Sequence, residues 1–325
     1  MKDQTINWGI IGCGDVTEVK SGPAFNKVPN SKLIAVMRRN AEKAKDYAQR
    51  HGVPKWYSDA DDLINDPEVN AIYIATPPLN HEEYAIKAMK AGKPVYVEKP
   101  MAIDAGAAER IKKTANETNV KITVAHYRRQ QPVFLKVKEL LQQKAIGDVR
   151  FVNMQMWQPH QSEIITQTEN HWRIDPSVSG GGLFYDLAPH QLDLMLYFFG
   201  KPKKFSGIAF NSSHFYNADD ITCGQILFDS NVVFNGSWCF TIAERKDLCE
   251  IIGSEGKLSF PIFDHKQIVL EREGTKTVIE FDKIQHVQQP MIQKVVEYFL
   301  DKASNPCSVT EGVEVMKMMD VMAGK

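Results

Sequence analysis

The first half of the chain alternates short apolar runs with longer amphipathic stretches. The apolar runs predict strands at 6–11, 32–37, 56–57, 71–75, 94–98 and 121–125. The stretches between them predict helices at 15–27, 41–51, 60–65, 80–91 and 105–118. Strands and helices in strict alternation indicate an α/β Rossmann domain, a doubly wound parallel sheet with helices on both faces. Ligands of such sheets bind beyond the carboxyl ends of the strands.

The second half has a different pattern. An amphipathic helix is predicted at 132–143, a long alternating strand at 148–158 and a loop at 162–168. A nearly continuous apolar run at 183–199 begins after Gly180-Gly181-Gly182 and stops at Gly200, as a helix would. Strand-like segments follow at 204–211, 218–228, 232–240, 246–253, 257–260, 267–272 and 276–281, with hairpin turns at Asp229-Ser230-Asn231 and Glu273-Gly274. They predict an α+β domain with a large, mostly antiparallel open sheet.

We therefore expect two domains. The first comprises residues 1–125 and the second residues 126–325. Two helices, at 288–302 and 310–322, close the chain and can pack back on the first domain.

Composition excludes several classes of protein. The chain has 325 residues, of which 43% are hydrophobic and 24% charged, and its formal net charge is −1. This balance favours neither nucleic-acid nor membrane-surface binding, and no apolar run approaches the roughly 20 residues that span a bilayer. Five widely spaced cysteines fit neither a disulfide framework nor a metal site, so we expect a cytoplasmic protein without a metal.

A glycine turn follows the first predicted strand. Gly12-Cys13-Gly14 leads into a helix whose first residues are Asp15 and Val16, which is the order of a dinucleotide-binding fingerprint. Thr17 replaces the third glycine, and it is small enough for close packing of helix on strand. We interpret Cys13 as a small residue that fits the turn and not as a nucleophile.

Two arginines follow the second predicted strand. Many NAD enzymes have an acidic residue here that binds the ribose 2′-hydroxyl, whereas this chain has Arg38 and Arg39. Guanidinium groups bind phosphate through several donors, so the pair favours NADP(H), with NAD(H) as the alternative. The other interpretation is a pair of ordinary surface arginines.

The helix predicted at 183–199 carries a polar stripe. Asp186, His190 and Asp193 fall within roughly 60° of one another on it. Such groups are costly to bury unless they pair, bind a ligand or take part in chemistry. The alternative is a helix whose polar stripe faces solvent.

Taken together, these motifs resemble those of the Gfo/Idh/MocA family of oxidoreductases. The resemblance rests on Gly12-Cys13-Gly14, on Ala75-Thr76-Pro77-Pro78 with His81, on Glu98-Lys99-Pro100, and on the Gly-Gly-Gly-x3-Asp-x3-His-x2-Asp pattern. It implies that Lys99, Asp186 and His190 meet at the nicotinamide and that the Lys99–Pro100 bond is cis. It also implies that residues 1–125 form the dinucleotide-binding domain. Residues 126–325 would then bind the substrate and join a homodimer or homotetramer through their sheet.

Further site residues come from the same strand ends and from the segment before the glycine triplet. For the cofactor we expect Gly12, Cys13, Gly14, Asp15, Val16, Arg38, Arg39, Thr76, Pro77, Asn80, His81, Glu98, Lys99, Trp172 and Arg173. For the substrate we expect Tyr127, Arg128, Asp186 and His190. Simple packing explains Trp172 equally well, and His81 and His126 fit the orientation of loops better than chemistry.

These residues suit hydride transfer between a nicotinamide and a CH–OH carbon. We expect His190 to exchange the hydroxyl proton, Lys99 to polarise the oxygen and relay the proton, and Asp186 to orient the substrate, with Asp193 as support. The predicted function is an NAD(P)-dependent sugar or polyol oxidoreductase. Two alternatives stay open: a non-catalytic NADP-binding sensor and a glycosidase that retains NAD.

Overall fold

The computed structural model describes residues 5–160, 172–264 and 267–325. The loop predicted at 162–168 lies outside these ranges. The chain divides into two compact units: Met1–Arg128 with Ile284–Glu314, and Arg129–Lys283 with Val315–Lys325. Among the described residues, no helix is long and apolar enough to cross a membrane. The first part of the first unit ends at Arg128, three residues after the expected boundary at 125. The first unit also includes the later segment Ile284–Glu314.

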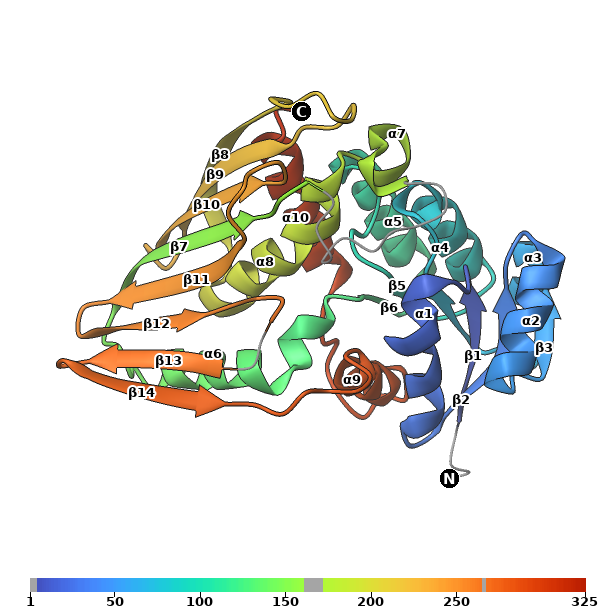
Figure 1. Cartoon of the computed structure of the whole chain (residues 1–325). Helices are drawn as coiled ribbons and strands as arrows, with labels where there is room; N and C mark the ends of the chain where they lie inside the picture. The colour runs from blue at the N-terminus through green and yellow to red at the C-terminus, as the bar shows by residue number, and fades with distance from the viewer. Residues whose placement is uncertain (1–4, 161–171, 265–266) are drawn as a thin grey trace. The chain divides into compact units, whose positions relative to one another are not determined.

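The first unit is built on a six-stranded sheet in the order β3-β2-β1-β4-β5-β6, and every pairing in it is parallel (Figure 1). Its strands are β1 (Ile6–Ile11), β2 (Ser31–Met37), β3 (Lys55–Tyr57), β4 (Ala71–Ile74), β5 (Val95–Val97) and β6 (Ile122–Val124). The strand order reverses between β1 and β4, which is the switch point where this fold binds ligands. Strands β4, β5 and β6 are buried at every residue, which explains their continuous apolar sequence.

Helices and 3₁₀ turns lie between these strands along the chain, and one further helix of the first unit comes from the later segment. They are α1 (Asp15–Val19), α2 (Ala41–His51), α3 (Ala60–Asn65), α4 (His81–Lys90), α5 (Ala105–Thr118) and, from the later segment, α9 (Gln289–Phe299), with the 3₁₀ turns η1 (Gly22–Lys27) and η2 (Pro78–Asn80). The single helix predicted at 15–27 is wrong, because α1 ends at Val19 and η1 replaces the rest. Pro23 has no N–H for a continuous helix, and Gly22 lies directly against the carbonyl of Thr17.

The second unit is built on an eight-stranded sheet in the order β14-β13-β12-β11-β7-β10-β9-β8 (Figure 1). Its strands are β7 (Val149–Trp157), β8 (Pro202–Phe210), β9 (Ile221–Phe228), β10 (Val233–Cys239), β11 (Lys246–Gly253), β12 (Gly256–Phe260), β13 (Gln267–Arg272) and β14 (Thr275–Glu280). All pairings are antiparallel except that of β7 with β10. Both predicted hairpin turns contain left-handed residues, with Asn231 at φ 62° and Glu273 at φ 50°.

Helix α8 (Leu183–Phe199) packs on this sheet. Phe184 meets the Trp238 ring edge-on at 5.0 Å, and the Trp238 indole donates to Gln191 Oε1 at 2.7 Å. The helix ends as predicted at Gly200, which has a φ of 82°. His190 and Asp193 are 5% and 1% exposed, so the alternative of a solvent-facing polar stripe is wrong.

The remaining elements of the second unit are α6 (Pro132–Gln142), α7 (Pro176–Ser179) and the 3₁₀ turn η4 (Trp172–Ile174). The turn η3 (Tyr127–Gln130) and helix α10 (Val309–Met322) each span a division between the units. Within the second unit, Met322 packs against the backbone of Gly207 and Gly224.

Candidate active site

The two glycines of the turn after β1 have different surroundings. Gly12 has a φ of 92°, and a Cβ atom there would lie 2.7 Å from the backbone nitrogen of Thr76. Only glycine fits such a position. A Cβ atom on Gly14 would meet no described atom within 4 Å. Gly12 is therefore required by the protein's own packing, whereas Gly14 leaves open space above the turn.

The amides of the turn also divide into two groups. Gly12 and Cys13 both donate to the Met37 carbonyl, at 2.9 and 3.1 Å, and Gly14 donates to the Thr17 hydroxyl at 2.9 Å. Asp15 and Val16 are the first residues of α1, so their N–H groups have no partner within the helix. These two amides, beside the open space at Gly14, form a cradle that fits a phosphate group.

Cys13 lies inside the turn and is 1% exposed. Burial raises the pKa of its thiol to about 12, and the charge of Arg38 offsets part of this effect. Cys13 is therefore a neutral packing residue, and the Arg38 guanidinium lies close enough to the turn to act on it. Arg39 is exposed. The Asn40 side chain accepts from the Lys43 amide and caps α2. The three residues between β2 and α2, at 38–40, include no carboxylate.

Thr76, Pro77, Asn80 and His81 follow β4. The Thr76 hydroxyl is buried and has no hydrogen-bond partner among the described residues. His81 is 1% exposed, with Nδ1 2.9 Å from the Pro100 carbonyl and Nε2 2.7 Å from the Thr76 carbonyl. Burial lowers the pKa of His81 to about 4, so the ring is neutral and donates to one carbonyl at a time.

Glu98 follows β5 and is 5% exposed. Its Oε1 accepts from the Tyr73 hydroxyl at 2.5 Å and from Gln288 Nε2 at 2.6 Å. Its Oε2 accepts from the backbone N–H of Lys99 at 3.1 Å. Glu98 was predicted to bind cofactor, but its carboxylate is held by groups of the first unit itself. Its contact with a cofactor stays a prediction.

Lys99 follows directly and is half-buried, and its bond to Pro100 is cis, as predicted. Tyr127 and Arg128 lie just beyond β6, both buried, with the Arg128 guanidinium 5.6 Å from the Tyr127 ring. The glycine turn and the residues after β2, β4, β5 and β6 thus share the carboxyl edge of one parallel sheet. The first unit contains all the expected cofactor residues except Trp172 and Arg173.

In the second unit, Asp186 is paired with Arg173. The Arg173 Nε lies 3.1 Å from Asp186 Oδ2, and the two side chains are 8% and 14% exposed. The Arg173 guanidinium stacks 4.4 Å from the Trp172 ring. Trp172, Arg173 and Asp186 therefore form one assembly that joins η4 to the start of α8.

His190 lies one turn further along α8. Its ring meets Phe263 edge-on, with 5.7 Å between ring centroids. Asp193, predicted as a supporting residue, is bound by Arg129 with Oδ1 2.7 Å from Nη2, and both side chains are at most 2% exposed. A buried carboxylate needs such a partner. Asp193 therefore anchors α8 to the segment that opens the second unit.

Lys99 belongs to the first unit, whereas Asp186 and His190 belong to the second. Their meeting at one site is part of the proposal below.

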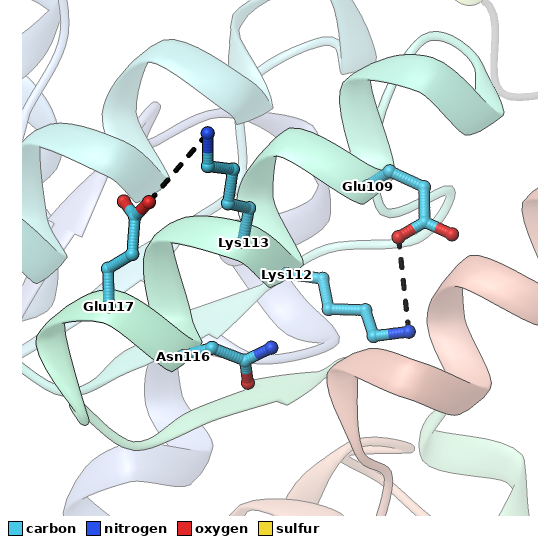
Figure 2. A pocket seen from close by; sticks show the side chains of 5 residues that line it. All are labelled: Glu109, Lys112, Lys113, Asn116 and Glu117. Carbon is cyan, nitrogen blue, oxygen red and sulfur yellow. Dashed lines mark ion pairs between the residues drawn. The ribbon is translucent and has the colours of Figure 1, made fainter.

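One hollow on the surface of the first unit is unrelated to these residues. Figure 2 shows it along α5, lined by Glu109, Lys112, Lys113, Asn116 and Glu117. Lys113 pairs with Glu117 at 3.8 Å and Lys112 with Glu109 at 3.9 Å. Such exposed pairs are typical of a solvated helix face and contribute little. Among the described residues, no group of His, Cys, Asp or Glu side chains could hold a metal ion.

Sequence reasoning missed three residues: Tyr73, Arg129 and Gln288. Tyr73 lies in an apolar strand, which is typical of a core residue. Arg129 is one of four polar residues in a row, at 128–131. Gln288 is 190 positions from Glu98, and no local pattern marks it. Their roles depend on long-range contacts that only the fold supplies.

Comparisons with known proteins show the family and the fold of the chain. The chain is 46% identical over 322 residues to Oxidoreductase P35 of Formosa agariphila, covering 99% of each chain. It is 30% identical over 203 residues to the scyllo-inositol 2-dehydrogenase (NADP(+)) IolW of Bacillus subtilis, covering 62% of this chain and 54% of that one. Its fold matches a levoglucosan dehydrogenase in complex with NADH and levoglucosan with a TM-score of 0.88 at 21% identity, covering 98% and 96% of the two chains.

Family models cover most of the chain. Residues 6–126 match the model described as an oxidoreductase family with an NAD-binding Rossmann fold. Residues 134–259 match the C-terminal domain model of the same family. The chain therefore belongs to the Gfo/Idh/MocA family of oxidoreductases.

Proposed function

We propose that this protein transfers a hydride between NADP(H) and a CH–OH carbon of a sugar or polyol. One observation carries the proposal: the first unit brings Lys99 to the same sheet edge as a glycine turn that is open at Gly14. A cofactor cradle and a titratable side chain at one strand edge are the elements that such a reaction needs.

The proposed cofactor contacts follow from the geometry of the turn. The amides of Asp15 and Val16 would hold the pyrophosphate, and Arg38 and Arg39 would hold a 2′-phosphate. The Thr76 hydroxyl is a further polar group available to the cofactor. The bound nicotinamide would supply the hydride acceptor or donor. The NADP named for the inositol dehydrogenase relative supports the same preference.

The proposed chemistry uses side chains of both units. His190 exchanges the hydroxyl proton, because an imidazole nitrogen can accept a proton and return it. Lys99 polarises the substrate oxygen and relays the proton. The Asp186 carboxylate, which is oriented by its contact with Arg173, accepts hydrogen bonds from substrate hydroxyls. Tyr127, Arg128 and Trp172 are proposed as walls of the site.

The substrate class is proposed from the relatives and from the residues. Two similar proteins are a levoglucosan dehydrogenase and a scyllo-inositol 2-dehydrogenase, and both of these compounds are polyhydroxylated rings. Each hydroxyl of such a ring both donates and accepts a hydrogen bond. A carboxylate can accept from these hydroxyls, an ammonium group can donate to them, and an imidazole can do either.

We also propose that the first unit is the cofactor domain and that the second unit binds substrate and forms a homo-oligomer. One face of the second unit's sheet carries the neighbouring side chains Phe210, Ile221, Cys239 and Trp157. Ile208 and Phe210 are 64% and 48% exposed. A second copy of the chain would cover this apolar face.

A panel of sugars and polyols, assayed with oxidised and reduced NADP and NAD by nicotinamide fluorescence, tests the function. We expect turnover of at least one polyol or sugar with NADP(H) in preference to NAD(H). Saturable cofactor binding without turnover of any member would support the sensor alternative. Nicotinamide that copurifies with the protein, together with cleavage of a glycoside, would support the glycosidase alternative.

A further inference from the structure

The buried carboxylate of Glu98 has an unusually complete set of partners within the first unit. Both oxygens accept hydrogen bonds, from the Tyr73 hydroxyl, from Gln288 Nε2 and from the Lys99 N–H. Glu98, Tyr73 and Gln288 are at most 5% exposed. A carboxylate in such surroundings depends on its donors, because water cannot replace them.

Gln288 is fixed in one orientation by its other contacts. Its Oε1 accepts from the Tyr96 hydroxyl at 3.1 Å, so its Nε2 must point to Glu98. Its backbone N–H donates to the Lys20 carbonyl at 3.3 Å, just after α1. The residue immediately precedes α9, and it connects that late segment of the chain with the strand ends of the first unit.

We infer that Gln288 is a positioning residue for Lys99, because it holds the Glu98 carboxylate that in turn fixes the Lys99 backbone. The role of Lys99 in turnover rests on the function proposed above. The hydrogen-bond chain from Gln288 through Glu98 to the Lys99 amide does not depend on that function.

Substitution of Gln288 by glutamate gives a signature that simple packing would not. At high pH two carboxylates would face each other and repel, and the Lys99 loop would loosen. As the pH falls, the pair takes up one proton, and the resulting O–H can donate to the other carboxylate as the amide did. Burial raises the pKa values of Tyr73 and Tyr96 well above the ordinary value, so both stay neutral donors throughout.

Amide hydrogen exchange at Lys99 tests the chain of contacts without any need for turnover. We expect Gln288→Leu to speed exchange of the Lys99 amide by about tenfold or more, because its acceptor is no longer held. The matched controls are Gln293→Leu and Gln293→Glu in α9, where the exposed Gln293 side chain donates to Glu297. They should leave this amide unchanged. Unchanged exchange in Gln288→Leu would overturn the inference, whether or not the protein turns over a sugar.

The pH dependence of kcat completes the test. At alkaline pH, we expect kcat of Gln288→Glu to be about tenfold lower than kcat of the unsubstituted protein. The ratio of the two kcat values should recover as the pH falls, and the two KM values for the cofactor should agree within about twofold. A kcat ratio that stays flat with pH, as in Gln293→Glu, would also overturn the inference. Faster amide exchange in Gln288→Leu in a protein that turns over no substrate would instead overturn the proposed function and leave the positioning role in place.

Discussion

Arg38 is the residue on which the choice of cofactor depends most. It is the first residue after β2, it lies near the glycine turn, and no carboxylate occupies the segment that leads to α2. A charge-assisted hydrogen bond to phosphate contributes about 1.5 kcal/mol at a partly exposed site, which corresponds to about tenfold in affinity. We expect Arg38→Ala to raise the Kd for NADPH by about that factor, to reduce its salt dependence and to leave NADH binding nearly unchanged.

Fluorescence titration of both cofactors measures this effect. Lys113→Ala, which removes an exposed lysine from α5, controls for the loss of one positive charge. Equal affinity of the unsubstituted protein for NADPH and NADH, or tighter binding of NADH, would show that Arg38 and Arg39 form only a solvated turn.

His81 makes stability depend on pH. Burial lowers its pKa from the ordinary 6.5 to about 4, so between these values the unfolded chain binds a proton that the folded protein does not. The folded state therefore has its full stability above pH 6.5, where His81 is neutral in both states. Its free energy of unfolding decreases as the pH falls towards 4, by up to about 3 kcal/mol. Urea unfolding across this range should show the free energy of unfolding falling more steeply for the unsubstituted protein than for His81→Gln. Parallel curves would contradict the assignment.

At the scale of elements, α8 carries two of the proposed functional groups. Asp186 and His190 are four residues apart and share one face of the helix. If they act on the same substrate, their losses are non-additive. We expect the double variant Asp186→Asn with His190→Gln to have a kcat/KM little below that of the worse single variant.

The free energies of unfolding should be measured for all four proteins of the cycle, because Asp186→Asn also weakens the ion pair with Arg173. Fully additive losses of kcat/KM would show that the two residues work separately.

The elements themselves were largely predictable from the sequence. The bounds of α5 and α8 agree with the apolar periodicity, because a glycine or a capping residue marks their ends. Gly22 and Pro23 interrupt the helix predicted at 15–27, and both are residues that a helix interior disfavours. The parallel pairing of β7 with β10 could not be predicted, because strand order depends on contacts between distant segments.

The same limit applies to the candidate site. Residues after strand ends, such as Arg38, His81 and Lys99, were found because the fold places strand ends together. The residues that hold the buried carboxylates of the site in place could not be found in the same way. Gln288 and Arg129 are polar residues without a local pattern, and their importance follows only from the buried carboxylates of Glu98 and Asp193.

At the scale of the whole molecule, the sheet face that carries Ile208 and Phe210 predicts self-association. Burial of two such side chains contributes about 3–6 kcal/mol in total. Light scattering at micromolar concentration should show a dimer or tetramer, and the double variant Ile208→Asp with Phe210→Asp should shift it towards the monomer. Val19→Asp, at an exposed apolar residue of the first unit, is the control. A monomer in the unsubstituted protein would contradict the proposed interface.

The central claim is that this oxidoreductase carries out its hydride transfer at Lys99. The most direct measurement compares kcat of the unsubstituted protein and of Lys99→Met on the sugar or polyol that the panel identifies, at saturating NADP(H). We expect kcat to fall at least about 100-fold, as for loss of an acid/base or oxygen-polarising group. The Kd for the cofactor and the free energy of unfolding should change little. Turnover by Lys99→Met close to that of the unsubstituted protein would remove Lys99 from the chemistry and contradict the account.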